Sequence, residues 1–168
     1  MANASLYLDS MRELSVALEK AMALTQNRLE VKTEFERIQS TPENDSKMIW
    51  NTVLDAMPKI TRLREAETSI QKDYLERLRN SVRIVLEYLL TLEESDLTGA
   101  SNDGPQKHLQ LLYEVIISRY TNDEERVDVD RGLAEQVLDK LDSYSQQQNA
   151  IIIKELVNKI LENCNYVG

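Results

Sequence analysis

A single histidine, His108, limits the catalytic schemes open to this chain. An all-helical acidic protein is a suitable background for phosphotransfer, which requires a histidine on an exposed helix face. The surrounding segment QKHLQLLYEV lacks the small residues that would give a partner access, and it matches no phosphotransfer motif. We therefore interpret His108 as a surface residue or a residue in the first turn of a helix, with phosphotransfer as the alternative.

Carboxylates three positions apart form pairs that could bind a divalent cation. A carboxylate-bridged di-metal bundle also needs a histidine three residues after a glutamate, but the residue three before His108 is Pro105. The acidic segment 121–132 fails the spacing of a calcium loop, since Gly132 as its turn glycine would put Val127 in the first ligand position. We interpret the carboxylates as solvated faces and connections. The pairs are Asp73 with Glu76, Glu93 with Asp96, Glu125 with Asp128, and Asp139 with Asp142.

The single cysteine, Cys164, cannot form a disulfide within the chain, which fits a reducing compartment. On a helical wheel it falls with Ile153, Leu156 and Ile160, so we predict a buried and unreactive thiol. The sequence has no glycine-rich phosphate loop, nucleophile elbow or zinc-ligand spacing. We therefore expect a protein without catalytic residues, metal or cofactor. The alternative hypothesis is a small all-α metal-dependent enzyme or phosphotransfer factor that uses carboxylates or His108.

The formal net charge of −9 disfavours direct binding to nucleic acids, because that binding depends largely on Lys and Arg. The arginines between Arg62 and Arg83 are interleaved with acidic residues, which favours pairing within a helix over a basic stripe. The start MANASLYLDSMRELS lacks a basic region followed by an apolar core, and no apolar run approaches the roughly 18 to 20 residues of a membrane span. We expect an intracellular protein, cytoplasmic or nuclear, with no membrane partner.

The composition predicts helices as the elements that carry these residues. Four glycines and three prolines leave few sites for the tight turns between strands. The segment STPEND at 40–45 supplies a helix stop followed by capping residues, so a helical hairpin is predicted there. Apolar residues follow helical spacing over residues 5–40, with a shift of phase between two sets: Met11, Leu14, Leu18 and Met22, then Leu24, Val31, Phe35 and Ile38.

A second helical segment spans about residues 45–94 and contains Pro58. A proline inside a helix removes a hydrogen bond and clashes with the preceding turn, so we predict a kink or break at Ala56 and Met57. The short helix before the proline has an apolar side made of Trp50, Val53, Leu54 and Met57.

Residues 74–92 carry an apolar arc of roughly two thirds of the helix circumference, which at least two neighbouring helices must cover. A linker at 93–106 separates this stretch from a new helix in which Pro105 suits the first turn. We predict that these two apolar helices pack on each other. The expected contacts join Leu78, Val82, Val85 and Leu89 to Leu112, Val115 and Ile116.

Helical spacing resumes after a charged connection at 121–132, and it leaves open whether 129–164 forms one bent helix or two. The predicted fold is an all-α, elongated helical bundle with an N-terminal helical hairpin, one long kinked helix and a C-terminal helical subdomain. We place the hairpin and long helix in residues 1–98. Residues 99–168 form the subdomain that packs on the end of the long helix.

The best candidate for a contact with another protein is Ile151, in the segment AIIIKEL. It falls roughly 100° outside the apolar arc of its helix, so a simple bundle would leave it exposed to a partner helix or a second copy of the chain. Alternatively, Tyr144 or the preceding glutamines cover it, or the helix begins after it. The sequence thus predicts a non-catalytic helical interaction module, a subunit or adaptor of a multiprotein complex.

Overall fold

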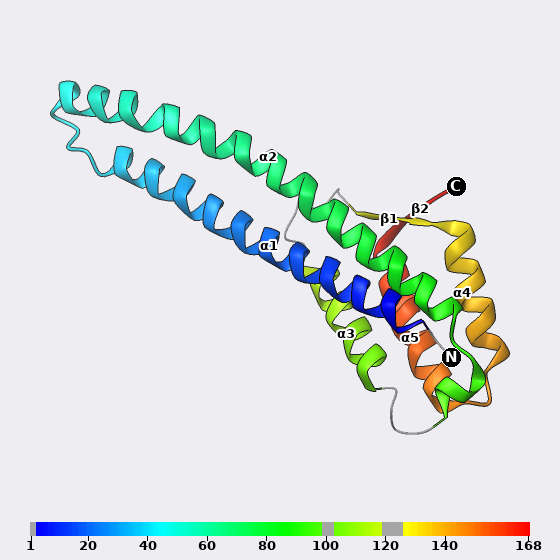
Figure 1. Ribbon diagram of the computed structural model, residues 1–168. Coiled ribbons are helices and arrows are strands. Elements are labelled where there is room, and N and C mark those ends of the chain that lie inside the picture. The colour runs from blue at the N-terminus through cyan, green and yellow to red at the C-terminus, as the bar shows by residue number, and fades with distance from the viewer. Residues whose placement is uncertain (1–2, 99–102, 119–125) are drawn as a thin grey trace. The chain divides into compact units, whose positions relative to one another are not determined.

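The computed structural model describes residues 3–98, 103–118 and 126–168, and helices dominate this part of the chain (Figure 1). The all-α class predicted from the sequence is confirmed. In chain order the elements are α1 (Ala4–Gln39), α2 (Ser46–Leu90), the 3-10 helix η1 (Glu94–Leu97), α3 (Asp103–Ser118), β1 (Val127–Asp130), α4 (Arg131–Ser143), α5 (Gln148–Glu162) and β2 (Cys164–Val167). Within these ranges, no helix is both long and apolar enough to cross a membrane.

Contacts divide the chain into two compact units. We call residues 1–18 together with 75–168 the core unit, and residues 19–74 the hairpin unit; α1 and α2 contribute to both. The boundary predicted at residue 98, between the hairpin with the long helix and the C-terminal subdomain, stays a prediction.

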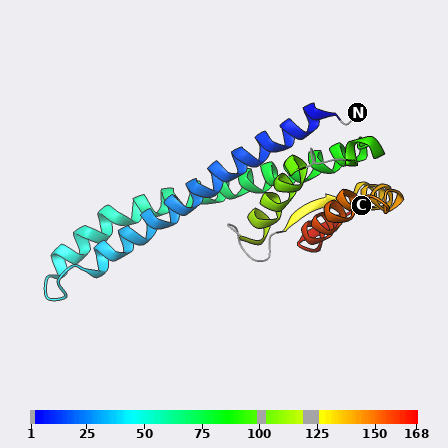
Figure 2. The same ribbon diagram turned by 90° about the horizontal axis from the view of Figure 1, so that it is seen from below.

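The helical hairpin predicted from the sequence is confirmed, since α1 and α2 run antiparallel in the hairpin unit (Figure 2). Residues 40–45 connect them. At the end of α1, Ser40 N donates to Glu36 O at 2.9 Å. At the start of α2, Asp45 Oδ1 accepts from Met48 N at 3.0 Å. Asp45 therefore caps α2, which satisfies a backbone N–H that has no partner inside the helix.

Small side chains line the buried side of α1. Ala17, Ala21 and Leu24 are at most 2% exposed and follow the alternating four- and three-residue spacing of a heptad. Met11 and Met22 belong to the apolar stripe identified in the sequence, yet they are 42% and 73% exposed. Leu14 and Leu24 of the predicted sets are buried, but Ala17 and Ala21, small residues that let helices pack closely, take the buried positions between them.

The helix α2 runs without interruption through Pro58, so the break predicted there is wrong, and the kink stays a prediction. Pro58 itself is exposed, whereas Ala56 and Ile60 on either side of it are buried at no more than 1% exposure. Burial on both sides of the proline stabilises the helix across the missing hydrogen bond.

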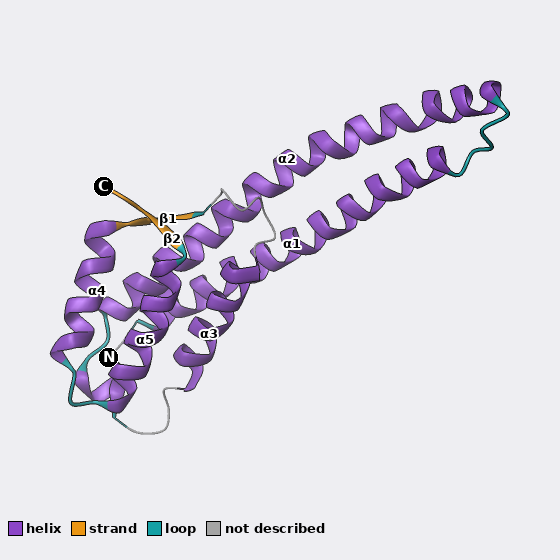
Figure 3. Ribbon diagram, turned by 180° about the vertical axis from the view of Figure 1, so that it is seen from behind, coloured by secondary structure: helices purple, strands orange, loops and turns teal. Residues whose placement is uncertain are grey.

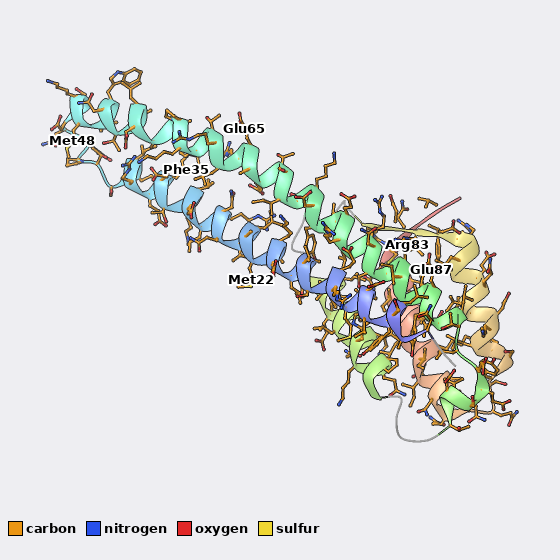
Figure 4. The ribbon with its side chains drawn as sticks, viewed as in Figure 1. Met22, Phe35, Met48, Glu65, Arg83 and Glu87 are labelled. Carbon is orange, nitrogen blue, oxygen red and sulfur yellow. The ribbon has the colours of Figure 1, made fainter. Side chains whose placement is uncertain are left out.

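The C-terminal part of α2 is buried over most of its circumference, as its wide apolar arc predicted. Arg83 and Glu87 lie on the remaining charged edge, where Arg83 Nη1 donates to Glu87 Oε1 at 3.1 Å (Figure 4). In the same unit, α5 packs against α3 and α4. The contacts expected between α2 and α3 stay a prediction, although all the residues named for them are buried: Leu78, Val82, Val85, Leu89, Leu112, Val115 and Ile116.

Two short strands were not predicted (Figure 3). The strands β1 and β2 pair in parallel, from Val127 opposite Cys164 to Asp130 opposite Val167. Asp130 ends β1 and also caps α4, because its Oδ1 accepts from Leu133 N at 2.9 Å. Residues 129–164 thus hold the end of β1, two helices and the start of β2. The sequence signal was the alternation VDVD, whose valines are buried and whose aspartates are exposed.

Candidate protein-binding surface

His108 lies inside the core unit, where it joins two serines from other helices. Ser10 Oγ donates to Ser81 O at 2.8 Å, and Ser81 Oγ donates to Ser10 O at 2.9 Å. Ser10 Oγ also lies 2.8 Å from His108 Nε2, where the direction of the hydrogen bond depends on the tautomer of the imidazole. The three side chains thus join α1, α2 and α3.

The surface position predicted for His108 is wrong, because this residue is only 5% exposed. Burial lowers the pKa of His108 to about 4, which keeps the imidazole neutral near pH 7. The ring of Tyr7 contacts it edge-on, with 5.5 Å between the ring centroids. A histidine enclosed in this way holds three helices together and offers no accessible nucleophile.

Cys164 is buried at 7% exposure, which confirms the burial predicted for it. Burial raises the pKa of its thiol to about 12, and the charge of Arg126 only partly opposes this shift. The residue begins β2 instead of continuing α5, so the helical wheel gave the right burial from the wrong element. A neutral thiol with this pKa is a poor nucleophile.

Three of the candidate carboxylates pair with a lysine or accept from a backbone N–H. Asp73 lies 3.6 Å from Lys20, and Asp142 pairs with Lys154. Asp96 accepts from Glu93 N at 2.9 Å in the first turn of η1. The pair formed by Glu125 lies outside the described residues. Where the chain is described, no three or more His, Cys, Asp or Glu side chains gather as they would around a metal ion.

Two arginines of the supposed basic stripe contact residues of α1. Arg77 Nη1 lies 3.2 Å from both carboxylate oxygens of Glu13 on α1. The guanidinium carbon of Arg64 lies 5.6 Å from the ring centroid of Phe35, close enough for a cation–π contact. The contacts thus link α1 to α2, in addition to the pairing within a helix that the sequence suggested.

Ile151 is 41% exposed on α5, so its predicted exposure is confirmed. Its neighbours Ala150 and Ile153 are buried, whereas Gln148 and Glu155, on the same side as Ile151, are exposed. Ile151 is therefore an apolar side chain on a polar face, and its role as a contact stays a prediction.

A larger apolar surface lies on α2 in the hairpin unit, and sequence reasoning missed that it is exposed. Trp50, Leu54 and Met57 are 63%, 56% and 42% exposed, and their spacing of four and three residues places them on one side of the helix. We call these three residues the Trp50 stripe. The buried side of this part of α2 instead contains Ala56 and Ile60.

The signal for this arrangement was present in the sequence but ambiguous. Two stripes with helical spacing compete in this part of α2, and only one can face α1. The sequence identified the bulkier stripe as an apolar side of the helix without deciding which way it faces. The structure exposes Trp50, Leu54 and Met57 and buries the stripe that contains Ala56 and Ile60.

A groove of about 460 Å³ runs between α1 and α2 of the hairpin unit. Leu29 and Leu63 are its apolar residues, and Leu29 is 55% exposed. The α1 wall is acidic and the α2 wall is basic. The charged lining residues are Glu30 and Glu34 on α1, with Lys59 and Arg62 on α2.

Comparison of the chain with family models, curated proteins and solved structures gives no match. Its function must therefore be inferred from its own surfaces. Among the described surfaces, the Trp50 stripe places three exposed apolar side chains on one face of one helix.

Proposed function

We propose that this chain is a non-catalytic helical module that binds other proteins, as a subunit or adaptor of a larger assembly. The observation that carries this proposal is the Trp50 stripe. A tryptophan and a leucine, each more than half exposed, lie one helical turn apart on the same side of α2. Exposed apolar area has a free-energy cost in water that a bound partner removes.

The size and composition of the Trp50 stripe suit a helical partner. A tryptophan alone buries roughly 150–250 Å² when covered. With the leucine and methionine added, the stripe approaches the few hundred Å² at which an exposed apolar patch is often functional. Tryptophan is also enriched among the residues that dominate binding energy at interfaces. An amphipathic helix laid along α2 would contact side chains with four- and three-residue spacing.

Ile151 is a second contact in this proposal, on the core unit. Its surroundings are polar, so it supplies one apolar point within a mixed surface. Such a residue suits the edge of an interface better than the centre, because the rim of an interface is polar and partly hydrated.

The alternative function, a metal-dependent enzyme or phosphotransfer factor, has less support. The burial of His108 removes the nucleophile that phosphotransfer requires. Asp73 and Asp142 are each paired with a lysine, and Asp96 accepts from a backbone N–H. No described feature favours catalysis over binding.

The test replaces Leu54 with Glu and compares this variant with Met48→Glu. Both residues are exposed and apolar, at 56% and 51%, but a helical wheel places them on different sides of α2. Tagged full-length chains are recovered from their native cells after brief crosslinking, and captured proteins are quantified by mass spectrometry.

We expect Leu54→Glu to reduce at least one specific partner about tenfold, because a charge replaces an apolar contact at the centre of the interface. Met48→Glu should leave the same partner unchanged. Equal recovery with all three chains would contradict the proposal. Circular dichroism of the purified variants establishes that both remain helical.

A further inference from the structure

The groove in the hairpin unit has apolar residues at two levels. Asn27 Nδ2 donates to Leu63 O at 2.9 Å, so Leu29 and Leu63 lie at nearly the same height. Met22 and Ile70 lie seven residues from them, on the same sides of their helices, and the Lys20–Asp73 ion pair marks their level. Seven residues correspond to about 10 Å along a helix. The apolar floor therefore extends beyond the groove itself.

The two walls of the groove each present a charge without an ionic partner. Arg62 makes no ion pair with any described residue, and Glu30 has only a hydrogen bond from Gln26, at 3.2 Å. The other charges of the groove are already paired within the chain. Lys59 lies 3.4 Å from Asp55, and Glu34 lies 2.9 Å from Arg37. An unpaired anion and an unpaired cation thus face the same groove from opposite helices.

We propose that this groove binds the same groove of a second copy of the chain. A two-fold axis running along the groove would place α1 of each copy on α2 of the other. Glu30 of each copy would then face Arg62 of the other copy, and this pairing would occur twice. Leu29 and Leu63 would meet their counterparts at the centre. An axis across the groove would instead place acidic wall on acidic wall, so the charges select the first arrangement.

Charge and area are compatible with this dimer. Most of the net charge of −9 lies in the core unit, whereas acidic and basic residues nearly balance in the hairpin unit.

The hairpin unit is about 30 Å long, from roughly 1.5 Å per residue, and two helices side by side are about 20 Å wide. Its face offers about 600 Å² per copy, so the dimer would bury about 1,200 Å², the lower limit for a specific interface. We therefore expect a dimer of moderate affinity.

This surface is separate from the Trp50 stripe. On a helical wheel, Lys59 lies about 140–180° from Leu54 and Trp50, and Arg62 lies about 80–120° from them, so the groove residues occupy another side of α2. Dimerisation through the groove and partner binding through the stripe therefore can succeed or fail independently.

The experiment measures the mass of the full chain by sedimentation equilibrium at about 10–100 μM, a range suited to micromolar affinity. The wild-type chain should be dimeric. Glu30→Lys and Arg62→Glu should each weaken the dimer about tenfold or more, because each places two like-charged pairs across the interface. Glu43→Lys and Lys72→Glu are the matched controls, since neither residue lines the groove. Both should remain dimeric.

An equimolar mixture of Glu30→Lys and Arg62→Glu provides the decisive result. In the mixed dimer every pair is again opposite in charge, so the mixture should form a heterodimer that native mass spectrometry identifies by its mass. The proposal would be overturned by a monomeric wild-type chain over the whole range. It would also be overturned by a dimer that tolerates both reversals, or by a mixture that stays monomeric. Circular dichroism checks that each variant is folded.

Discussion

At the scale of single residues, the most informative group is the buried set of Ser10, Ser81 and His108. Its hydrogen bonds satisfy polar groups that would otherwise destabilise the core unit, because an unpaired buried polar group has a large free-energy cost. His108 contributes only in its neutral form, since a second ring proton would charge an imidazole that is 5% exposed. The stability of the fold should therefore depend on its protonation.

We predict that stability falls as the pH decreases from about 6.5 to about 4. The pKa of His108 is about 4 in the folded chain and 6.5 as the reference value, so the unfolded state takes up the proton first. The free energy of unfolding should lose about 3 kcal/mol over this window through His108, and nothing through it above pH 7. Urea unfolding at a series of pH values measures the loss.

His108→Gln is the control for this prediction, because glutamine keeps an N–H donor but does not titrate. Carboxylates contribute equally to both chains, so the difference between the two pH profiles isolates His108. Parallel profiles would show that burial does not shift its titration.

Sequence reasoning at this scale succeeded for Cys164 and failed for His108. A cysteine is small and apolar, so the surrounding isoleucines and leucines were enough to predict burial. The burial of His108 depends on hydroxyl partners at Ser10 and Ser81, which lie about 100 and 30 residues away in the sequence. No local pattern reports such partners, so the site could not be predicted from one sequence.

At the scale of elements, the helices and the hairpin turn could be predicted, but the orientation of each helix could not. Periodicity located α1 and α2, and the STPEND segment located the turn between them. Both helices carry two apolar stripes, and the structure buries the one that contains alanine. The strands were missed because four alternating residues are too few to distinguish from a charged connection.

We predict that Ala21→Leu destabilises the hairpin, whereas Met22→Ala does not. Ala21 is 2% exposed, so extra methylenes would force α1 away from its neighbours, at a cost of about 1–3 kcal/mol. Met22 is 73% exposed, so its truncation should change the free energy of unfolding by less than about 0.5 kcal/mol. Thermal unfolding followed by circular dichroism compares them. The reverse order would mean that the methionine stripe is the buried one.

At the scale of the whole molecule, the described chain has well-packed helices and little accessible chemistry. The two groups with the largest pKa shifts, His108 and Cys164, are buried in the core unit, and most of the chain's exposed apolar side chains lie on helices. This distribution separates the residues that maintain the fold from the exposed apolar residues of the proposed binding surfaces.

Ile151→Glu should leave the fold intact and weaken assembly. The side chain is 41% exposed, so a carboxylate there remains hydrated and should change the free energy of unfolding by less than about 1 kcal/mol. Partner recovery should fall severalfold, measured by pull-down from native cells. Gln148→Glu, one turn earlier on the same helix face, is the matched control for added charge. A loss of helical signal would assign Ile151 to the core, and unchanged recovery would exclude it from the interface.

The most direct measurement for the proposed function is site-specific photo-crosslinking in the native cell. A photoreactive amino acid is placed at position 54 in the Trp50 stripe or, as the control, at position 48 on another side of α2. Binding through the stripe predicts a discrete crosslinked protein from position 54 that is absent from position 48. Crosslinking at position 54 that yields no adduct, or the same adducts as position 48, would contradict the assignment of the Trp50 stripe as a protein-binding surface.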